Sequence, residues 1–194
     1  ELQGVIGCYI SANEGYNEDV SDAIRDHYSP VGPNDICPTK PVTVSVALAD
    51  KIDTLVGFYI VGERSTGSGD QYGLRRAALG IIRIIIENNL NVNLNSLFFL
   101  SIQSFSDQGV DNDKERICNE VQDFVTARLV AFLKNNGVRH DIISASLPFL
   151  KVDNLNAVLA RVDALKSFAF SEGGLSLLGG YKRASNILSI EEKK

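Results

Sequence analysis

Residues 66–79 read TGSGDQYGLRRAAL, a glycine-rich loop that leads directly into a pair of arginines. Backbone N–H groups ahead of a helix N-terminus are favourable ground for an anion such as phosphate. The loop nevertheless lacks the lysine of the pattern G-x-x-x-x-G-K-[ST], and it follows a predicted helix rather than a strand. Asp70 also places a carboxylate where the phosphate would sit. The local pattern therefore favours a flexible loop closed by an Asp70 cap over a nucleotide site.

The two arginines differ in their predicted surroundings on a helix over residues 70–89. At about 100° per residue, the apolar side chains of this helix cover roughly 200° of its circumference, which predicts a largely buried element. Arg76 falls on the single polar stripe and is expected to point to solvent, where it can meet a phosphate. Arg75 lies on the apolar flank, so its guanidinium needs an internal partner. The polar stripe consists of Arg76, Gly80, Arg83 and Glu87.

Two carboxylates, Asp50 and Asp53, lie one turn apart on a predicted helix over residues 42–62. Asp50 shares a face of small residues with Thr54 and Gly57, and a carboxylate there requires a cation. An ion pair with Arg75 or Arg76 is favoured over a metal ion, because a metal normally needs several convergent ligands, including histidines. We expect Arg75 to pair with Asp50 or Asp53.

Histidine chemistry is sparse, because the chain has only His27 and His140. His27 lies on a surface-type helix. His140 precedes Asp141, which is placed to cap a helix beginning at Ile142, so the His-Asp dipeptide is interpreted as a coincidence. No Ser/His/Asp or Cys/His arrangement can be assembled, and no metal site is predicted.

The elements that must position these residues are predicted to be helical throughout, so the fold class is all-α. The hydrophobic content is 44%, with 22% charged residues and a net charge of −5, which is ordinary for a globular protein and argues against a surface coated with nucleic-acid-binding residues. Asn17 is a good N-cap for a helix that stops before Pro30. The β-branched segment 42–62 is too long for a strand and is predicted to be a helix. Further helices are predicted over 93–105, 113–136, 141–150, 153–171 and 174–189.

Three features of the sequence concern its cellular compartment, the presence of membrane-spanning helices and whether it is part of a longer protein. The three cysteines are far apart and form no C-x-x-C pair, which fits a reducing compartment and a cytoplasmic location. No apolar run approaches the roughly 18 residues that a membrane-spanning helix requires. The chain has no methionine and begins within an apolar pattern, so it is expected to be a piece of a longer protein.

The segment from Val46 to Leu90, VALADKIDTLVGFYIVGERSTGSGDQYGLRRAALGIIRIIIENNL, resembles the HD-type helical domain of the β subunit of bacterial glycyl-tRNA synthetase. The patterns ADK-x-DTL-x-G and TGS-x-D-x-x-x-LRRAALG carry the likeness, and the terminal YKRASNIL continues it in order. The resemblance covers nearly the whole chain and is loosest over about residues 95–150. It divides the chain into an HD-like helical domain over 1–106 and a helical connector over 107–194, which leads into an anticodon-binding domain.

The resemblance implies a role in glycyl-tRNA aminoacylation. The family's enzyme is a tetramer of two α and two β subunits, in which the α subunit activates glycine with ATP and Mg²⁺ and the β subunit binds tRNA-Gly. The chain would then be a component of a glycine–tRNA ligase, with no cofactor and no catalytic residue of its own. The implied tRNA contacts are Arg75, Arg76, Arg83, Lys182 and Arg183.

The HD-type name comes from metal-dependent phosphohydrolases, whose ligands run His, His-Asp and a final Asp. Asp50 matches that last position, with Asp53 beside it, as a vestige of the site, whereas His140 and Asp141 come in the wrong chain order. Two other functions stay open: a working metal-dependent phosphohydrolase, and a purely structural module that holds subunits or domains together.

Overall fold

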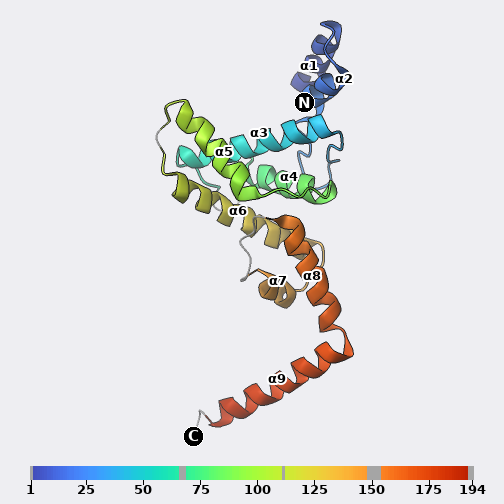
Figure 1. Cartoon of the computed structure of the whole chain (residues 1–194), viewed down its shortest axis with the longest axis vertical. Coiled ribbons are helices and arrows are strands. Elements are labelled where there is room, and N and C mark those ends of the chain that lie inside the picture. The colour runs from blue at the N-terminus through green and yellow to red at the C-terminus, as the bar shows by residue number, and fades with distance from the viewer. Residues whose placement is uncertain (1, 66–68, 111, 148–153, 192–194) are drawn as a thin grey trace.

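The computed structural model describes residues 2–65, 69–110, 112–147 and 154–191. Those ranges contain nine α-helices and no strand, which confirms the predicted all-α class (Figure 1). The HD-like label for the bundle stays a prediction, and residues 66–68 of the glycine-rich loop lie outside the described ranges. The helices are α1 (Leu2–Asn13), α2 (Glu18–Asp26), α3 (Pro41–Ile60), α4 (Leu74–Glu87), α5 (Leu94–Asp107), α6 (Lys114–Asn135), α7 (His140–Ser146), α8 (Leu155–Ala169) and α9 (Glu172–Glu191).

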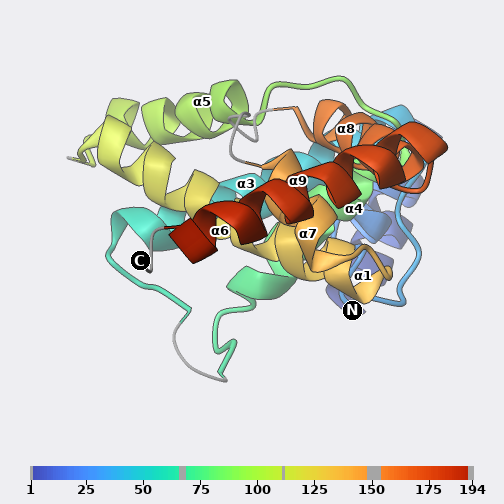
Figure 2. The same cartoon turned by 90° about the horizontal axis from the view of Figure 1, so that it is seen from below.

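The helices form an elongated molecule with a central bundle of α3 to α6 (Figure 1). The α1–α2 hairpin packs on α3 at one end, while α7 and α8 follow α6 at the other. Seen from below, α5 lies along one edge of the bundle (Figure 2). Among the described helices, α9 contacts only α8 and extends away from the body. No helix in the described ranges is both long and apolar enough to cross a membrane.

A single hydrophobic core runs through the bundle and crosses residue 106, where the sequence predicts a domain boundary. It joins Leu55 of α3 and Ile81 of α4 to Phe98 of α5 and Val121 of α6, each completely buried. The same core continues to Val158 of α8. The predicted domain boundary between residues 106 and 107 stays a prediction, but one hydrophobic core includes residues from both sides of it.

Side-chain caps set several helix starts. Asn17 accepts a hydrogen bond from the backbone N–H of Asp19 at 2.9 Å, which confirms it as the N-cap of α2. Asp70 is not the N-cap of α4, because Gly73 occupies that position in a left-handed conformation with φ +68°. A turn closed by the Gly73 N–H and the Asp70 carbonyl lets the Asp70 carboxylate accept instead from the N–H groups of Arg75 (2.9 Å) and Arg76 (3.3 Å). Asp70 therefore satisfies the first turn of α4 from outside the helix.

Helix α4 is buried around most of its circumference, as predicted, but Gly80 is not on a solvent-facing stripe. Gly80 is buried, and a Cβ added to it would lie 2.7 Å from Cε of Lys51. The Lys51 side chain crosses α4 at this point and donates hydrogen bonds to the carbonyls of Tyr28 (2.9 Å) and His27 (3.2 Å). Burial lowers the pKa of the Lys51 ammonium. Lys51 thereby joins α3 and α4 to the end of α2.

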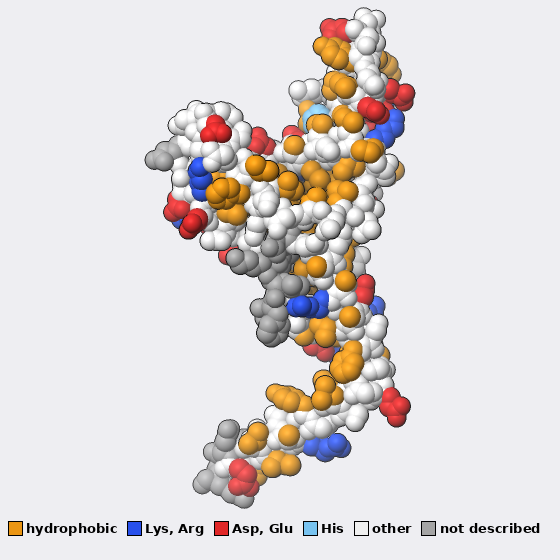
Figure 3. Space-filling view, viewed as in Figure 1, with side chains coloured by type: hydrophobic (Ala, Val, Ile, Leu, Met, Phe, Trp, Pro, Cys, Tyr) orange, Lys and Arg blue, Asp and Glu red, His pale blue; other side chains and the backbone are white. Residues whose placement is uncertain are grey.

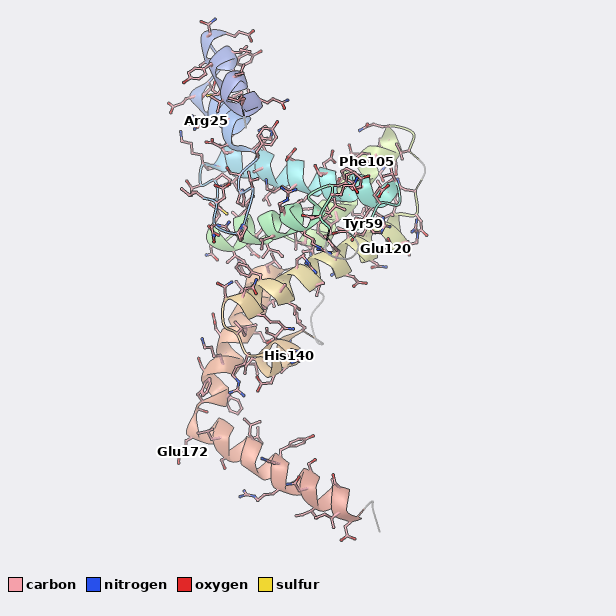
Figure 4. All side chains as sticks on the ribbon, turned by 180° about the vertical axis from the view of Figure 1, so that it is seen from behind. Arg25, Tyr59, Phe105, Glu120, His140 and Glu172 are labelled. Atoms are coloured by element: carbon pink, nitrogen blue, oxygen red, sulfur yellow. The ribbon has the colours of Figure 1, made fainter. Side chains whose placement is uncertain are left out.

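Arg64 fixes the end of α3 to α6. Its guanidinium lies 4.0 Å from the ring centroid of Tyr59 and donates to the Tyr59 carbonyl at 2.9 Å. It also forms an ion pair with Glu120 of α6, which lies close to Tyr59 in Figure 4. Arg116 binds the second carboxylate oxygen of Glu120 at 3.0 Å. The hydrogen bond from Arg64 is the main reason that the pKa of Glu120 lies below its ordinary value.

We expect Glu120→Gln to lower the free energy of unfolding by about 1 kcal/mol at neutral pH, since the pair is partly exposed. Because the folded-state pKa of Glu120 is lowered, its contribution is complete above the ordinary value of 4.5 and is lost as the pH falls through the lower folded-state value. Urea unfolding at pH 7 and at pH 3 measures this difference, which should shrink at the lower pH. Glu115→Gln, an exposed change on the same helix, should leave the stability nearly unchanged. An equal loss for the two variants at pH 7 would contradict the assignment.

Candidate functional site

The start of α4 presents Arg76 to solvent, as the helix geometry predicts. Its side chain is 57% exposed, and its Nε lies 3.5 Å from Oδ2 of Asp70. The guanidinium folds back over Gly73, where an added Cβ would lie 3.2 Å from Nη2. An ion pair this long and exposed is weak, so Arg76 remains available to an external anion.

Arg83 lies inside the fold, contrary to its expected place on a solvent-facing stripe. It is 8% exposed, and its Nε donates to Glu87 at 2.8 Å. Its Nη1 and Nη2 donate to the carbonyls of Gly32 (2.8 Å) and Asp35 (2.7 Å). The loop over residues 30–40 folds over this face of α4 and takes up the donors. Arg83 therefore anchors the loop, and its contact with tRNA stays a prediction.

Arg75 and Arg76 line a hollow between α4, α6 and the loop over residues 30–40, which we call the arginine hollow. Its volume is about 380 Å³. Its described lining includes four arginines and no carboxylate. Such a surface attracts anions, because positive charge gathered in a concave site focuses the electrostatic field. The lining residues are Pro33, Asn34, Arg75, Arg76, Leu79, Arg83, Arg128, Ala131, Phe132, Asn135 and Asn136.

Arg128 of α6 is the member of this site that the sequence interpretation missed. Its Nε is buried with no hydrogen-bond partner among the described residues, and its guanidinium lies 5.7 Å from the ring centroid of Phe124. A usable signal was present, because Arg128, Phe132 and Asn135 recur at the spacing of one helix face. No motif in the sequence indicated that this face of α6 would pack against α4.

The two carboxylates Asp50 and Asp53 lie elsewhere, in a groove between α3 and α5 with a volume of about 950 Å³. Asp53 accepts a hydrogen bond from the Ser101 hydroxyl at 2.8 Å. Arg75 lines the arginine hollow, and the ion pairs of the described residues do not join it to either carboxylate. The expected pairing of Arg75 with Asp50 or Asp53 is wrong, because the two sets of residues line different sides of the bundle.

The histidines do not extend this groove into a metal site. His27 Nδ1 lies 2.9 Å from the Ile24 carbonyl at the end of α2, and His140 is the first residue of α7. Helix α7 already begins at His140, so Asp141 is not the N-cap of a helix beginning at Ile142, although its carboxylate accepts from the Ile142 N–H at 3.0 Å and pairs with Arg139. Among the described residues, no three His, Cys, Asp or Glu side chains are grouped so as to hold a metal ion.

Lys182 and Arg183 are exposed on α9. Figure 3 shows hydrophobic side chains along the same helix. Leu177, Tyr181 and Leu188 of α9 are exposed. The predicted basic positions are therefore accessible, on an element that is separate from the arginine hollow.

The described geometry is that of an all-helical protein with an arginine-lined hollow suited to anions. The family model for the glycyl-tRNA synthetase beta subunit matches residues 1–148. The chain therefore belongs to the glycyl-tRNA synthetase β-subunit family.

Curated relatives agree over the full chain. The glycine–tRNA ligase beta subunit of Rhodospirillum centenum is 47% identical over all of this chain, which covers 27% of that relative. The same subunit of Phenylobacterium zucineum is 45% identical, with 26% of it covered, and that of a Ruegeria species is 44% identical, with 27% covered. The chain thus spans about a quarter of the length of the curated relatives it matches.

Proposed function

We propose that this chain is a tRNA-binding portion of the β subunit of a glycine–tRNA ligase. In this proposal it binds tRNA-Gly and positions it for an α subunit in an α2β2 enzyme of the cytoplasm. The α subunit uses ATP and Mg²⁺ to activate glycine, and the present chain contributes no catalytic residue. The observation that carries the proposal is the match to glycine–tRNA ligase beta subunits over the whole chain.

The proposed mechanism is positional. Arg75, Arg76, Lys182 and Arg183 are the candidate contacts, and arginine and lysine bind phosphate oxygens with charge-assisted hydrogen bonds. Contacts to the phosphate backbone fix the orientation of a nucleic acid and give binding that weakens with salt, but they do not read the base sequence. The identity of tRNA-Gly would be read elsewhere in the enzyme.

The test of this role is Arg76→Ala in the assembled ligase. We expect the KM for tRNA-Gly to rise about fivefold, the effect of losing one exposed phosphate contact worth about 1 kcal/mol. Glycyl-adenylate formation, measured by ATP–pyrophosphate exchange, should not change, because that step does not involve tRNA. Arg25→Ala is a matched control, since Arg25 is a partly exposed arginine on α2, at the end of the molecule that α1 and α2 form (Figure 4).

An unchanged tRNA KM in Arg76→Ala would contradict this role for Arg76. An enzyme that also gives no tRNA footprint on this portion of the β subunit would favour the alternative of a structural contact module. The exposed apolar residues of α9 support that alternative, because a helix that contacts only α8 within the described ranges leaves them uncovered.

A further inference from the structure

We infer that the arginine hollow is a seat for one phosphodiester group, with Arg128 as its main ligand. The inference rests on the proposed function in one respect, since the phosphate is assigned to the backbone of bound tRNA. The recognised chemistry is a tetrahedral oxyanion, which either a nucleic-acid backbone or free phosphate can supply. Nothing in the family match assigns a role to Arg128.

Among the described residues, the arginines of the hollow differ in whether they have an ion-pair partner. Arg83 is neutralised by Glu87 at 2.8 Å, and Arg76 faces Asp70 at 3.5 Å. Within the described ranges, no carboxylate forms an ion pair with Arg128. The positive charge of Arg128 is therefore available to an anion in the hollow.

The position of Arg128 favours an oxyanion over a diffuse cloud of counterions. Its Nε is buried and has no hydrogen-bond partner among the described residues, and a buried donor without a partner costs stability. The ring centroid of Phe124 lies 5.7 Å from the guanidinium, within the range of a cation–π contact. A guanidinium held in one plane can donate two parallel hydrogen bonds to two oxygens of one phosphate.

The remaining walls of the hollow suit the same ligand. Leu79, Ala131 and Phe132 form an apolar lining, which strengthens electrostatic attraction by lowering the local polarity. Asn34 and Asn135 place amide groups at the lining, and amides can donate to phosphate oxygens. The volume of about 380 Å³ is near the low end of small-ligand sites, about 300–1,000 Å³, and suits one phosphate with its adjoining sugar.

The hollow also joins two elements that the sequence places far apart. Arg76 comes from the first turn of α4, and Arg128 comes from the second half of α6. A phosphate held between them would be gripped from two helices of the rigid core, which fixes its position more accurately than a contact on the exposed helix α9. The proposed seat is thus a fixed point for the RNA backbone, whereas the basic residues of α9 lie on a separate, exposed helix.

The first arm of the test uses inorganic phosphate and the 194-residue chain. Titration at constant ionic strength, followed by the ¹⁵N signal of Arg128 Nε, should give a saturable shift. Arg128→Ala should abolish phosphate binding, and Arg128→Lys should weaken it because lysine lacks the planar pair of donors. Arg116→Ala removes an exposed arginine from the same helix and should leave phosphate binding unchanged. Absence of a saturable shift in the unaltered chain would overturn the seat.

The second arm uses tRNA-Gly and the assembled ligase. Arg128→Ala should weaken tRNA binding about tenfold, the effect of one charge-assisted contact, and reduce the slope of log K against log salt by about 1. Arg128→Lys keeps the charge and the aliphatic stem, so an intermediate loss with an unchanged melting temperature would separate binding from folding. Arg116→Ala should bind tRNA normally.

The two arms distinguish the possible failures. If the chain binds phosphate at Arg128 but the tRNA affinity of Arg128→Ala is normal, the seat takes free anions and its assignment to RNA is overturned. If neither phosphate nor tRNA binding responds to Arg128 while the unaltered ligase binds tRNA, the seat is wrong and the proposed function stands. If the unaltered ligase shows no tRNA contact with this portion of the chain, the proposed function itself fails.

Discussion

Phe98→Ala is expected to lower the free energy of unfolding of the chain by about 4 kcal/mol, near the upper end of core truncations. Phe98 is completely buried on α5, where the hydrophobic core joins α3, α4 and α6. Its removal takes a large ring out of a close-packed interior and leaves a cavity that the surrounding helices cannot fill. In a chain of this length, the melting temperature should fall by about 10 °C.

Phe99→Ala is the matched control for this prediction. Phe99 is the next residue on the same helix, and 45% of its surface is exposed. The same change there should cost less than about 1 kcal/mol, because little apolar surface leaves the core. Urea unfolding of the two variants compares them directly. Equal losses would show that the rotation of α5 about its axis differs from the one described.

The order of the helices was largely predictable from the sequence, because the local signals agree with the tertiary fold. Helix α3 was predicted despite its β-branched residues, since its length excludes a strand, and it forms over Pro41–Ile60. The predicted start of α4 at Asp70 was too early. The Asp70 carboxylate accepts hydrogen bonds from the first turn, but Gly73 is the N-cap, and its left-handed turn delays the helix to Leu74. The ends of the helices predicted over 141–150 and 153–171 fall partly outside the described residues.

Side-chain environments were less predictable, because they depend on contacts between residues far apart in the sequence. A helical wheel places Gly80 and Arg83 on a polar stripe, but it contains no information about what packs on that stripe. The loop over residues 30–40 covers Arg83, and the Lys51 side chain covers Gly80. A polar stripe on a helix becomes buried when a distant segment supplies acceptors for its donors. Here the backbone carbonyls of Gly32 and Asp35 accept hydrogen bonds from Arg83.

The residues of the arginine hollow were only partly predictable, because they too come together through contacts between distant parts of the sequence. The sequence singled out Arg75 and Arg76 because they follow a glycine-rich loop, and the structure places both in the arginine hollow. Arg128 shares a helix face with Phe132 and Asn135, but the sequence does not indicate that this face meets α4, and Arg128 joins the two arginines because α4 packs on α6. The expected pairing of Arg75 with Asp50 or Asp53 was wrong for a similar reason. Helices α3 and α4 follow one another in the sequence, but this order does not determine which faces of the two helices meet.

Lys51→Ala is expected to lower the free energy of unfolding by about 3 kcal/mol, from two effects that add. The change removes the donor to the carbonyls of His27 and Tyr28, and a buried acceptor left without a partner costs about 1–3 kcal/mol. It also opens a cavity beside Gly80, where the aliphatic stem now packs. Lys51→Met, which keeps the stem and loses only the donor, should therefore lose about half as much, and exposed Lys134→Ala should lose almost nothing.

A double-mutant cycle of Lys51 and Gly80 tests whether the two residues are in contact. Gly80→Ala alone should be destabilising, because its new methyl group would lie within 2.7 Å of Lys51 Cε and the tethered lysine cannot move aside freely. In the Lys51→Ala background the same methyl group would enter the vacated space, so Gly80→Ala should become neutral or stabilising there. Unfolding free energies of the four proteins measure this coupling. Strictly additive losses would mean that Lys51 does not cross α4 at Gly80, and that its stabilising role lies elsewhere.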